Sequence, residues 1–289
     1  MVPIDDRILF YLGETASWSG PDPDPVGTVG YDVPILLDKP TYKDRYREIH
    51  PNTMYPIDVG RYLNLTSKAL YIQCGDHMYD GTYPVLVKCR KEGAVGGGVI
   101  ANLNSARHFG PVAELGGDTP WEDKISTMAW RGADTGGEPR LQFVKRFYKN
   151  YNVGFSQYVQ DGPYSSDYLA GHMSIPTLLR YKYLPVVPGN DKSSSLGWVM
   201  ASGSVPLMPR PRIHSWVCEP WMKAGVHYVQ CEDDWSDLED KIKWCQNNDA
   251  QCQTIAENGK KFMLQFNNSS VEKYIEQSMV NIIGSRKIY

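Results

Sequence analysis

Apolar and polar stretches alternate regularly in the second half of the chain. Short, nearly continuous apolar runs predict buried strands, and between them lie stretches whose apolar residues recur at helical spacing. Strands are expected at residues 125–130, 181–187, 204–208 and 226–231. This alternation predicts an α/β architecture with a mostly parallel sheet covered by helices on both faces.

The intervening helices carry signals at their ends. Residues 139–150 combine helical spacing with a basic end, which suits a helix C-terminus. Residues 193–202 predict a short helix. Gly259 is expected to end a further helix, and Ser270 to cap the last helix of the chain.

The first half gives a weaker pattern. Residues 68–76 and 82–90 predict buried strands, the first ending at Gly75 and Asp76, and residues 93–103 predict a glycine-rich turn that leads into a third strand. Residues 1–66 predict little regular structure.

Composition and charge exclude several classes of function. A net charge of −3 does not suit a surface that binds nucleic acid or anionic lipid. Apolar runs fall short of the roughly 20 residues that span a membrane, and the acidic start is unlike a secretory signal. We therefore expect a cytoplasmic protein. The six cysteines form no C-x-x-C pair, which favours free thiols over a metal site.

The polar turn "GNDKSSS" (189–195) lies between an expected strand and an expected helix. In parallel sheets, ligands bind beyond the carboxyl ends of the strands. The backbone N–H groups at a helix start favour a phosphate. The alternative is simple capping of the helix by serine.

Three blocks of sequence resemble glycosyltransferase family 90. They are "PWEDKISTMAWRGADTG" (120–136), "YKYLPVVPGNDKSSSLGWVMASGSVPLM" (181–208) and the stretch that begins "HSWVCEPWMKAGVHYVQ" (214–263). The resemblance implies a GT-B fold, with two facing Rossmann-like domains and the active site in the cleft. It also implies an inverting transfer from a UDP-sugar, without an essential metal or a cofactor other than this co-substrate.

On this basis residues 1–120 are expected to form an acceptor-side domain, completed by a helix at 270–289. Residues 121–269 are expected to bind the nucleotide sugar. The acids Asp22 and Asp24 of "DPD" lie in a proline-rich stretch and are interpreted as a turn, not as metal ligands.

The resemblance assigns the catalytic base to Asp76. The family has a hydrophobic-I-N-x-x-D pattern there, and "YIQCGDHM" matches it with Gln73 in place of Asn. The alternative is a turn-forming Asp after a strand, and Asp80 is the nearest competitor for the role.

The nucleotide site is carried over residue by residue. Arg131 and Gly132 belong to the W-R-G motif, Ala133 replaces a serine that contacts UDP, and Arg140 fits a nucleotide-contacting arginine. For Arg140 the alternative is a solvated helix start.

The diphosphate is expected against Asn190, Asp191, Lys192, Ser193, Ser194 and Ser195. Ser195 stands where eukaryotic members have an arginine, and Lys192 is the candidate for the missing charge. Glu219 is assigned to the ribose, with a plain surface acid as the alternative.

The predicted reaction moves a sugar, xylose in the first instance, from a UDP-sugar to a hydroxyl of a glycan or glycoprotein. Two alternatives stay open: the same reaction with UDP-glucose, or an inactive module that binds carbohydrate or nucleotide. Neither nucleic acid nor a membrane span is expected.

Overall fold

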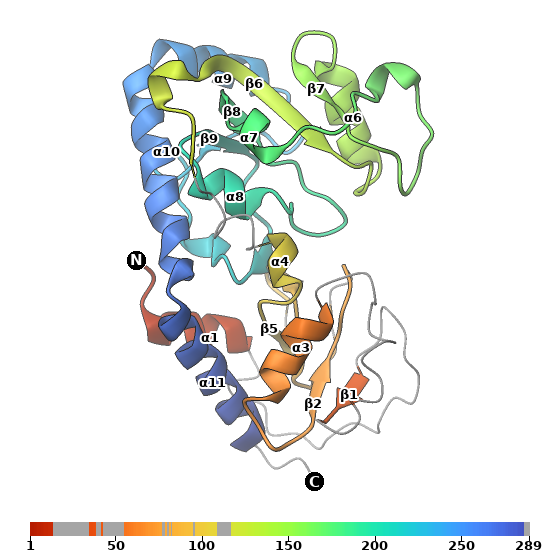
Figure 1. Ribbon diagram of the computed structural model, residues 1–289, viewed down its shortest axis with the longest axis vertical. Helices are drawn as coiled ribbons and strands as arrows, with labels where there is room; N and C mark the ends of the chain where they lie inside the picture. The colour runs from red at the N-terminus through yellow and green to blue at the C-terminus, as the bar shows by residue number, and fades with distance from the viewer. Residues whose placement is uncertain are drawn as a thin grey trace. The chain divides into compact units, whose positions relative to one another are not determined.

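The computed structural model divides the chain into two compact units (Figure 1). The first unit comprises Met1–Gly110, Arg212–Trp221 and Phe266–Tyr289, and the second comprises Pro111–Pro211 and Met222–Gln265. Within these, the structure describes residues 1–13, 35–38, 42, 55–76, 79, 81, 83–94, 96–108 and 117–285. The predicted turn at Asp22 and Asp24, and the candidate Asp80, lie outside the described residues.

The second unit is built on a five-stranded parallel sheet of order β11-β9-β8-β6-β7. Its strands are β6 (Ile125–Gly132), β7 (Asn152–Phe155), β8 (Tyr181–Pro185), β9 (Val205–Met208) and β11 (Val229–Gln230). Its helices are α6 (Glu138–Phe147), α7 (Ile175–Leu178), α8 (Leu196–Ala201), α9 (Leu238–Asn247) and α10 (Asp249–Leu264). The predicted parallel α/β architecture of this half is confirmed.

The core of this unit follows from its apolar strands. Strand β9 is buried throughout, and so is β8 after its first residue, as in parallel strands covered on both faces. Helix α10 packs against α8 and β9. The prediction that Gly259 ends a helix is wrong, because α10 continues through it. A Cβ at Gly259 would lie 2.8 Å from the carbonyl oxygen of His227, so the glycine allows close packing instead.

The first unit contains a four-stranded sheet of order β1-β2-β3-β5. Strands β2 (Leu70–Ile72), β3 (Val85–Val87) and β5 (Gly98–Ile100) are parallel, and β1 (Ile35–Leu37) pairs antiparallel with β2. A separate antiparallel pair joins β4 (Cys89–Lys91) to β10 (Ile213–Ser215). The helices described in this unit are α1 (Ile4–Leu12), α3 (Tyr55–Leu63), α4 (Ser105–His108) and α11 (Ser269–Ser285).

Helices α1 and α3 correct the expectation of little regular structure in residues 1–66. Helix α1 packs against α11, and its buried Arg7 forms an ion pair with Glu272 at 2.6 Å. The Arg7 guanidinium also lies 4.6 Å from the ring centroid of Phe266. These partners lie far away in sequence, so the local pattern does not reveal the helix.

The units divide the chain differently from the predicted boundaries at residues 111–120, 212–221 and 266–269, of which 212–221 is the segment inside a predicted domain. Residues 212–221 fall within the predicted domain 121–269, but they lie in the first unit because β10 pairs with β4. Helix α11 also lies in the first unit.

Candidate active site

The loops after β6 and β8 leave the parallel sheet at its carboxyl edge, where the direction of the strand order reverses. From β6 the chain continues to β7 on one side, and from β8 it continues to β9 on the other side. This is the topological switch point, where open α/β sheets bind ligands. Arg131, Gly132 and Ala133 belong to the first exit and residues 190–195 to the second. The structure thus brings two predicted groups to one edge.

The two loops are held directly against each other. The N–H of Gly136 donates to Asn190 Oδ1 at 2.9 Å. Gly136 has a φ of +99°, and a Cβ there would lie 2.9 Å from the Cα of Gly189. Both the left-handed backbone and the close approach favour glycine at position 136.

Arg140 braces both loops from the first turn of α6. Its guanidinium donates to the carbonyls of Val187 and Pro188 after β8, at 2.9 and 3.1 Å. It also donates to the Ala133 carbonyl at 2.9 Å and to Thr135 Oγ1 at 2.8 Å after β6. The side chain is buried, so the alternative of a solvated helix start is wrong. The predicted nucleotide contact stays a prediction.

Arg131 is directed towards strand β7. Its Nη1 donates to the carbonyls of Trp130 and Asn152, both at 2.8 Å, and its Nη2 donates to Asn152 Oδ1 at 2.5 Å. Burial lowers the pKa of Arg131 from its ordinary value. Asn152 is the first residue of β7 and lies opposite Ala129, so these contacts fasten β6 to the amino end of its neighbour.

The polar turn at 190–195 combines exposed, buried and half-buried positions, with Asn190 exposed. Asp191, Lys192 and Ser193 are each less than a tenth exposed. The hydroxyls of Ser193 and Ser195 lie 2.9 Å apart, and the Ser195 N–H approaches Ser193 Oγ at 3.4 Å. Helix α8 begins only at Leu196, and the Ser195 side chain makes no capping hydrogen bond. The alternative that Ser195 caps helix α8 through its side chain is therefore wrong.

Asp134 is a residue of the first loop that the sequence analysis missed. Its carboxylate accepts four backbone N–H bonds, from Val159, Gln160, Asp161 and Gly162, at 2.6, 3.1, 3.0 and 2.8 Å. Burial opposes ionisation, but these donors lower the pKa of Asp134 below its ordinary value. Asp134 thus fixes the loop after β7 against the loop after β6. Its place directly after W-R-G-A was the only signal in the sequence.

Other motif residues meet at the opposite, amino edge of the sheet. The Trp121 indole N–H donates to Asp249 at 2.8 Å, and Lys182 forms an ion pair with the same carboxylate at 2.6 Å. The Lys182 ammonium lies 4.5 Å from the Trp121 ring centroid. Lys124 is buried and bonds Asp118 at 2.6 Å and Ser204 at 3.1 Å. All three resembling blocks therefore contribute to a structural network away from the loops.

In the first unit, Asp76 lies beyond the carboxyl end of β2. Its side chain is 39% exposed, and Oδ1 accepts from Lys88 Nζ at 2.5 Å. Lys88 directly follows the neighbouring parallel strand β3, and its side chain is 3% exposed. The sequence carried a signal for Lys88, because a lysine inside the apolar run 85–90 needs a charged or polar partner once buried.

Glu219 lies in the first unit, in the short helical turn Glu219–Trp221. It is buried, so the alternative of a surface acid is wrong. Its two carboxylate oxygens accept from the N–H and hydroxyl of Ser215, at 2.6 and 2.5 Å. The predicted contact with a ribose stays a prediction.

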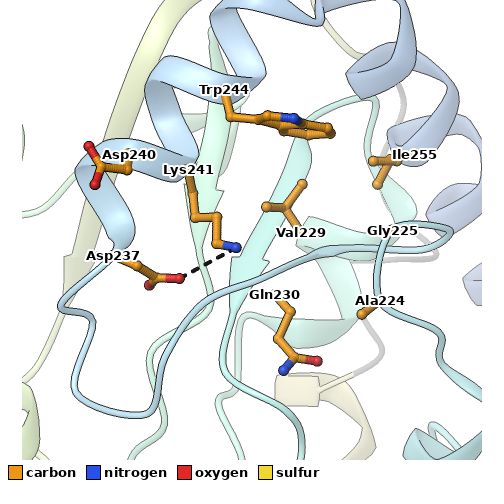
Figure 2. Close-up of a pocket in the computed structure, with 9 residues that line it drawn as sticks. All are labelled: Ala224, Gly225, Val229, Gln230, Asp237, Asp240, Lys241, Trp244 and Ile255. Atoms are coloured by element: carbon orange, nitrogen blue, oxygen red, sulfur yellow. Dashed lines mark ion pairs between the residues drawn. The ribbon is translucent and has the colours of Figure 1, made fainter.

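A cavity of about 560 Å³ opens elsewhere in the second unit, beside the edge strand β11. Figure 2 shows the indole of Trp244 across it from Val229, with the Asp237–Lys241 ion pair to one side. The nine lining residues do not include any of the predicted site residues.

All six cysteines are buried thiols outside any disulfide. Within the described part of the chain, no three His, Cys, Asp or Glu residues are grouped so as to hold a metal ion. In the same residues, no helix combines the length and apolar character needed to cross a membrane.

Comparison with known proteins identifies relatives of this chain. It is 34% identical to O-glucosyltransferase LpsA of Dichelobacter nodosus, over 58% of this chain and 51% of the relative. It is 30% identical to protein O-glucosyltransferase 2 of Danio rerio, over 54% of this chain and 30% of the relative. The chain thus spans about half or less of the length of these relatives. Residues 105–282 match the family model described as "Glycosyl transferase family 90", and the chain belongs to this family.

Proposed function

We propose that the chain is an inverting, UDP-sugar-dependent glycosyltransferase of the GT-B type that acts on a hydroxyl of a glycan or glycoprotein. The single observation that carries this proposal is the pair of joined loops at the switch point of a parallel sheet, in a member of a glycosyl transferase family. The acceptor-side and nucleotide-side roles of the two units are part of the same proposal.

In this proposal the donor diphosphate lies against residues 190–195 and the uridine near residues 132–140. The N–H groups of the turn, the serine hydroxyls and Lys192 would offset the charge that develops on UDP as it leaves. Helix α8 has 6 residues, so its macrodipole contributes less than these local donors. We assign Arg140 to holding the two loops together, because its four hydrogen bonds go to protein acceptors.

Asp76 is the proposed general base. As the acceptor oxygen bonds to the anomeric carbon, its proton passes to the Asp76 carboxylate, and the bond to UDP breaks with its electron pair staying on the phosphate oxygen. The carboxylate is 39% exposed at the carboxyl edge of β2, which leaves it accessible to an acceptor. The chemistry requires neither a covalent intermediate nor, we propose, a divalent metal.

The donor sugar is a choice between glucose and xylose. On sequence alone, xylose is the first expectation. The names of two relatives, both O-glucosyltransferases, favour glucose. We therefore propose UDP-glucose as the first donor to test and UDP-xylose as its competitor.

Thermal unfolding with each nucleotide tests the donor site. A ligand at about 100 times its Kd stabilises the fold by about 2.7 kcal/mol. We expect UDP and UDP-glucose at saturation to raise the Tm, and ADP-glucose at the same concentration to leave it unchanged. Equal stabilisation by both nucleotides, or by neither, would contradict a uridine-specific site.

An inactive binding module is the second candidate, favoured by Ala133 and Ser195 standing where the family has serine and arginine. Release of UDP from the stabilising UDP-sugar, with water and a panel of saccharides as acceptors, separates the two functions. A module would be stabilised by UDP and release none.

A further inference from the structure

Lys88 and Asp76 form a pair that the topology of the first unit builds. Strands β2 and β3 are parallel neighbours, with Ile72 opposite Leu86, so both exits lie at the same edge of the sheet. The Lys88 ammonium is 2.5 Å from Asp76 Oδ1. A buried ammonium is costly without a counter-charge. The ion pair therefore fixes the position of the Asp76 carboxylate as well as that of the Lys88 ammonium.

Two other titratable groups are described near this pair, one on α3 and one in the segment after β2. Tyr55 on α3 donates its hydroxyl to the Gly75 carbonyl at 3.1 Å, and burial raises its pKa to about 12. Cys74, two residues before Asp76, also has its pKa raised to about 12 by burial. Both are therefore neutral near pH 7.

Asp58, also on α3, is engaged elsewhere. Its carboxylate accepts from the N–H and hydroxyl of Ser105, at 2.7 and 2.6 Å, and pairs with Arg61 at 3.2 Å. The ammonium of Lys88, in contrast, is in direct contact with the Asp76 carboxylate.

We propose that Lys88 is a positioning residue that holds the Asp76 carboxylate ionised and oriented towards the acceptor hydroxyl. This inference rests on the proposed function, in which Asp76 is the base. Protonation of Asp76 would leave the Lys88 ammonium without its counter-charge. Lys88 therefore favours the ionised carboxylate, and the same interaction makes that carboxylate a weaker base. Removing Lys88 should therefore change both the pH profile and the rate.

The test uses Lys88→Met, Lys88→Arg and the matched control Lys91→Met, which removes an exposed lysine from the adjoining strand β4. The measurement is kcat/KM against pH, with the UDP affinity and the Tm of each variant. An opposite charge at this distance lowers a carboxyl pKa by about 1–3 units. In Lys88→Met, the acidic limb of the kcat/KM profile should therefore move to higher pH by about 1–3 units. The plateau value of kcat/KM should fall about tenfold or more, and the affinity for UDP should stay unchanged.

Lys88→Arg keeps the charge, so its acidic limb should stay in place, and Lys91→Met should match the wild type in limb and plateau. Asp76 is partly exposed, so its carboxylate can be rehydrated when Lys88 is removed. If Lys88→Met nevertheless fails to fold, Lys88→Gln carries the same expected limb shift. A folded charge-removing variant with the wild-type limb would overturn the inference.

The double variant Asp76→Asn/Lys88→Met separates action through Asp76 from a general structural effect. If Lys88 acts through Asp76, the double variant should retain a residual rate within about twofold of Asp76→Asn alone. A further tenfold loss would overturn the inference while leaving the proposed function intact. Near-wild-type turnover by Asp76→Asn would instead reject Asp76 as the base, and the role of Lys88 with it.

Discussion

Replacing Arg140 by methionine tests whether this side chain braces the loops or contacts the donor. Methionine keeps much of the length and apolar stem but removes four hydrogen bonds to Val187, Pro188, Ala133 and Thr135. These bonds join the loop after β6 to the loop after β8, so their loss frees both loops at once.

The magnitude follows from the kind of bond. A hydrogen bond from a charged donor contributes about 1.5–3 kcal/mol. The loop carbonyls regain some water in the variant, and the buried guanidinium no longer has to be desolvated. We therefore expect a net loss of about 3–5 kcal/mol, the usual cost of breaking a buried network. At about 2–4 °C per kcal/mol, the Tm should fall by about 6–20 °C.

The assay is thermal and urea unfolding, followed by UDP binding at a temperature where both variants are folded. Arg146→Met is the matched control on α6, because Arg146 makes an exposed hydrogen bond to the Ser236 carbonyl and should change stability by about 0.5 kcal/mol or less. An Arg140→Met variant as stable as this control, yet unable to bind UDP, would refute the bracing role and support direct nucleotide contact.

Two further predictions concern Asp134 and metal. Asp134 has a lowered pKa, so its ionised form stabilises the fold above the ordinary Asp pKa of about 3.9, and this contribution is lost as pH falls through the lowered value. In urea unfolding at pH 7, Asp134→Asn should be less stable than the wild type by about 1–3 kcal/mol. The difference in free energy of unfolding should be smaller at pH 3, and an equal difference at both pH values would contradict this. Transfer should persist in excess EDTA, whereas loss of turnover restored by Mn²⁺ would show a metal requirement, with Asp22 and Asp24 the first ligands to test.

The second unit could be predicted well from the sequence because its buried strands are nearly continuous apolar runs. Residues 181–187 and 204–208 are such runs, so the local sequence alone indicates the buried strands β8 and β9, which pair with each other. The carboxyl ends of these strands then fixed where the candidate loops would lie.

The first unit was predicted less well because its stability depends on distant partners. Helix α1 is held by α11 from the other end of the chain, and β10 pairs with β4 across more than a hundred residues. Neither pairing leaves a local pattern.

The same distinction applies to the site. The positions of Asp76 and of 190–195 follow from strand exits. The roles of Arg140, Asp134 and Lys88 depend on which backbone groups and side chains the fold brings to them, so spacing alone could not separate a nucleotide contact from a brace.

Asp76→Asn is the most direct test of the proposed chemistry. The change keeps size and most hydrogen bonds but removes the base, which contributes roughly a hundred- to ten-thousand-fold in rate. We predict that the variant binds UDP and the UDP-sugar with wild-type affinity and loses transfer by at least that lower factor, while Asp80→Asn stays active. Near-wild-type turnover by Asp76→Asn would show that the base lies elsewhere, and loss of donor binding would place Asp76 in the nucleotide site or in a structural role.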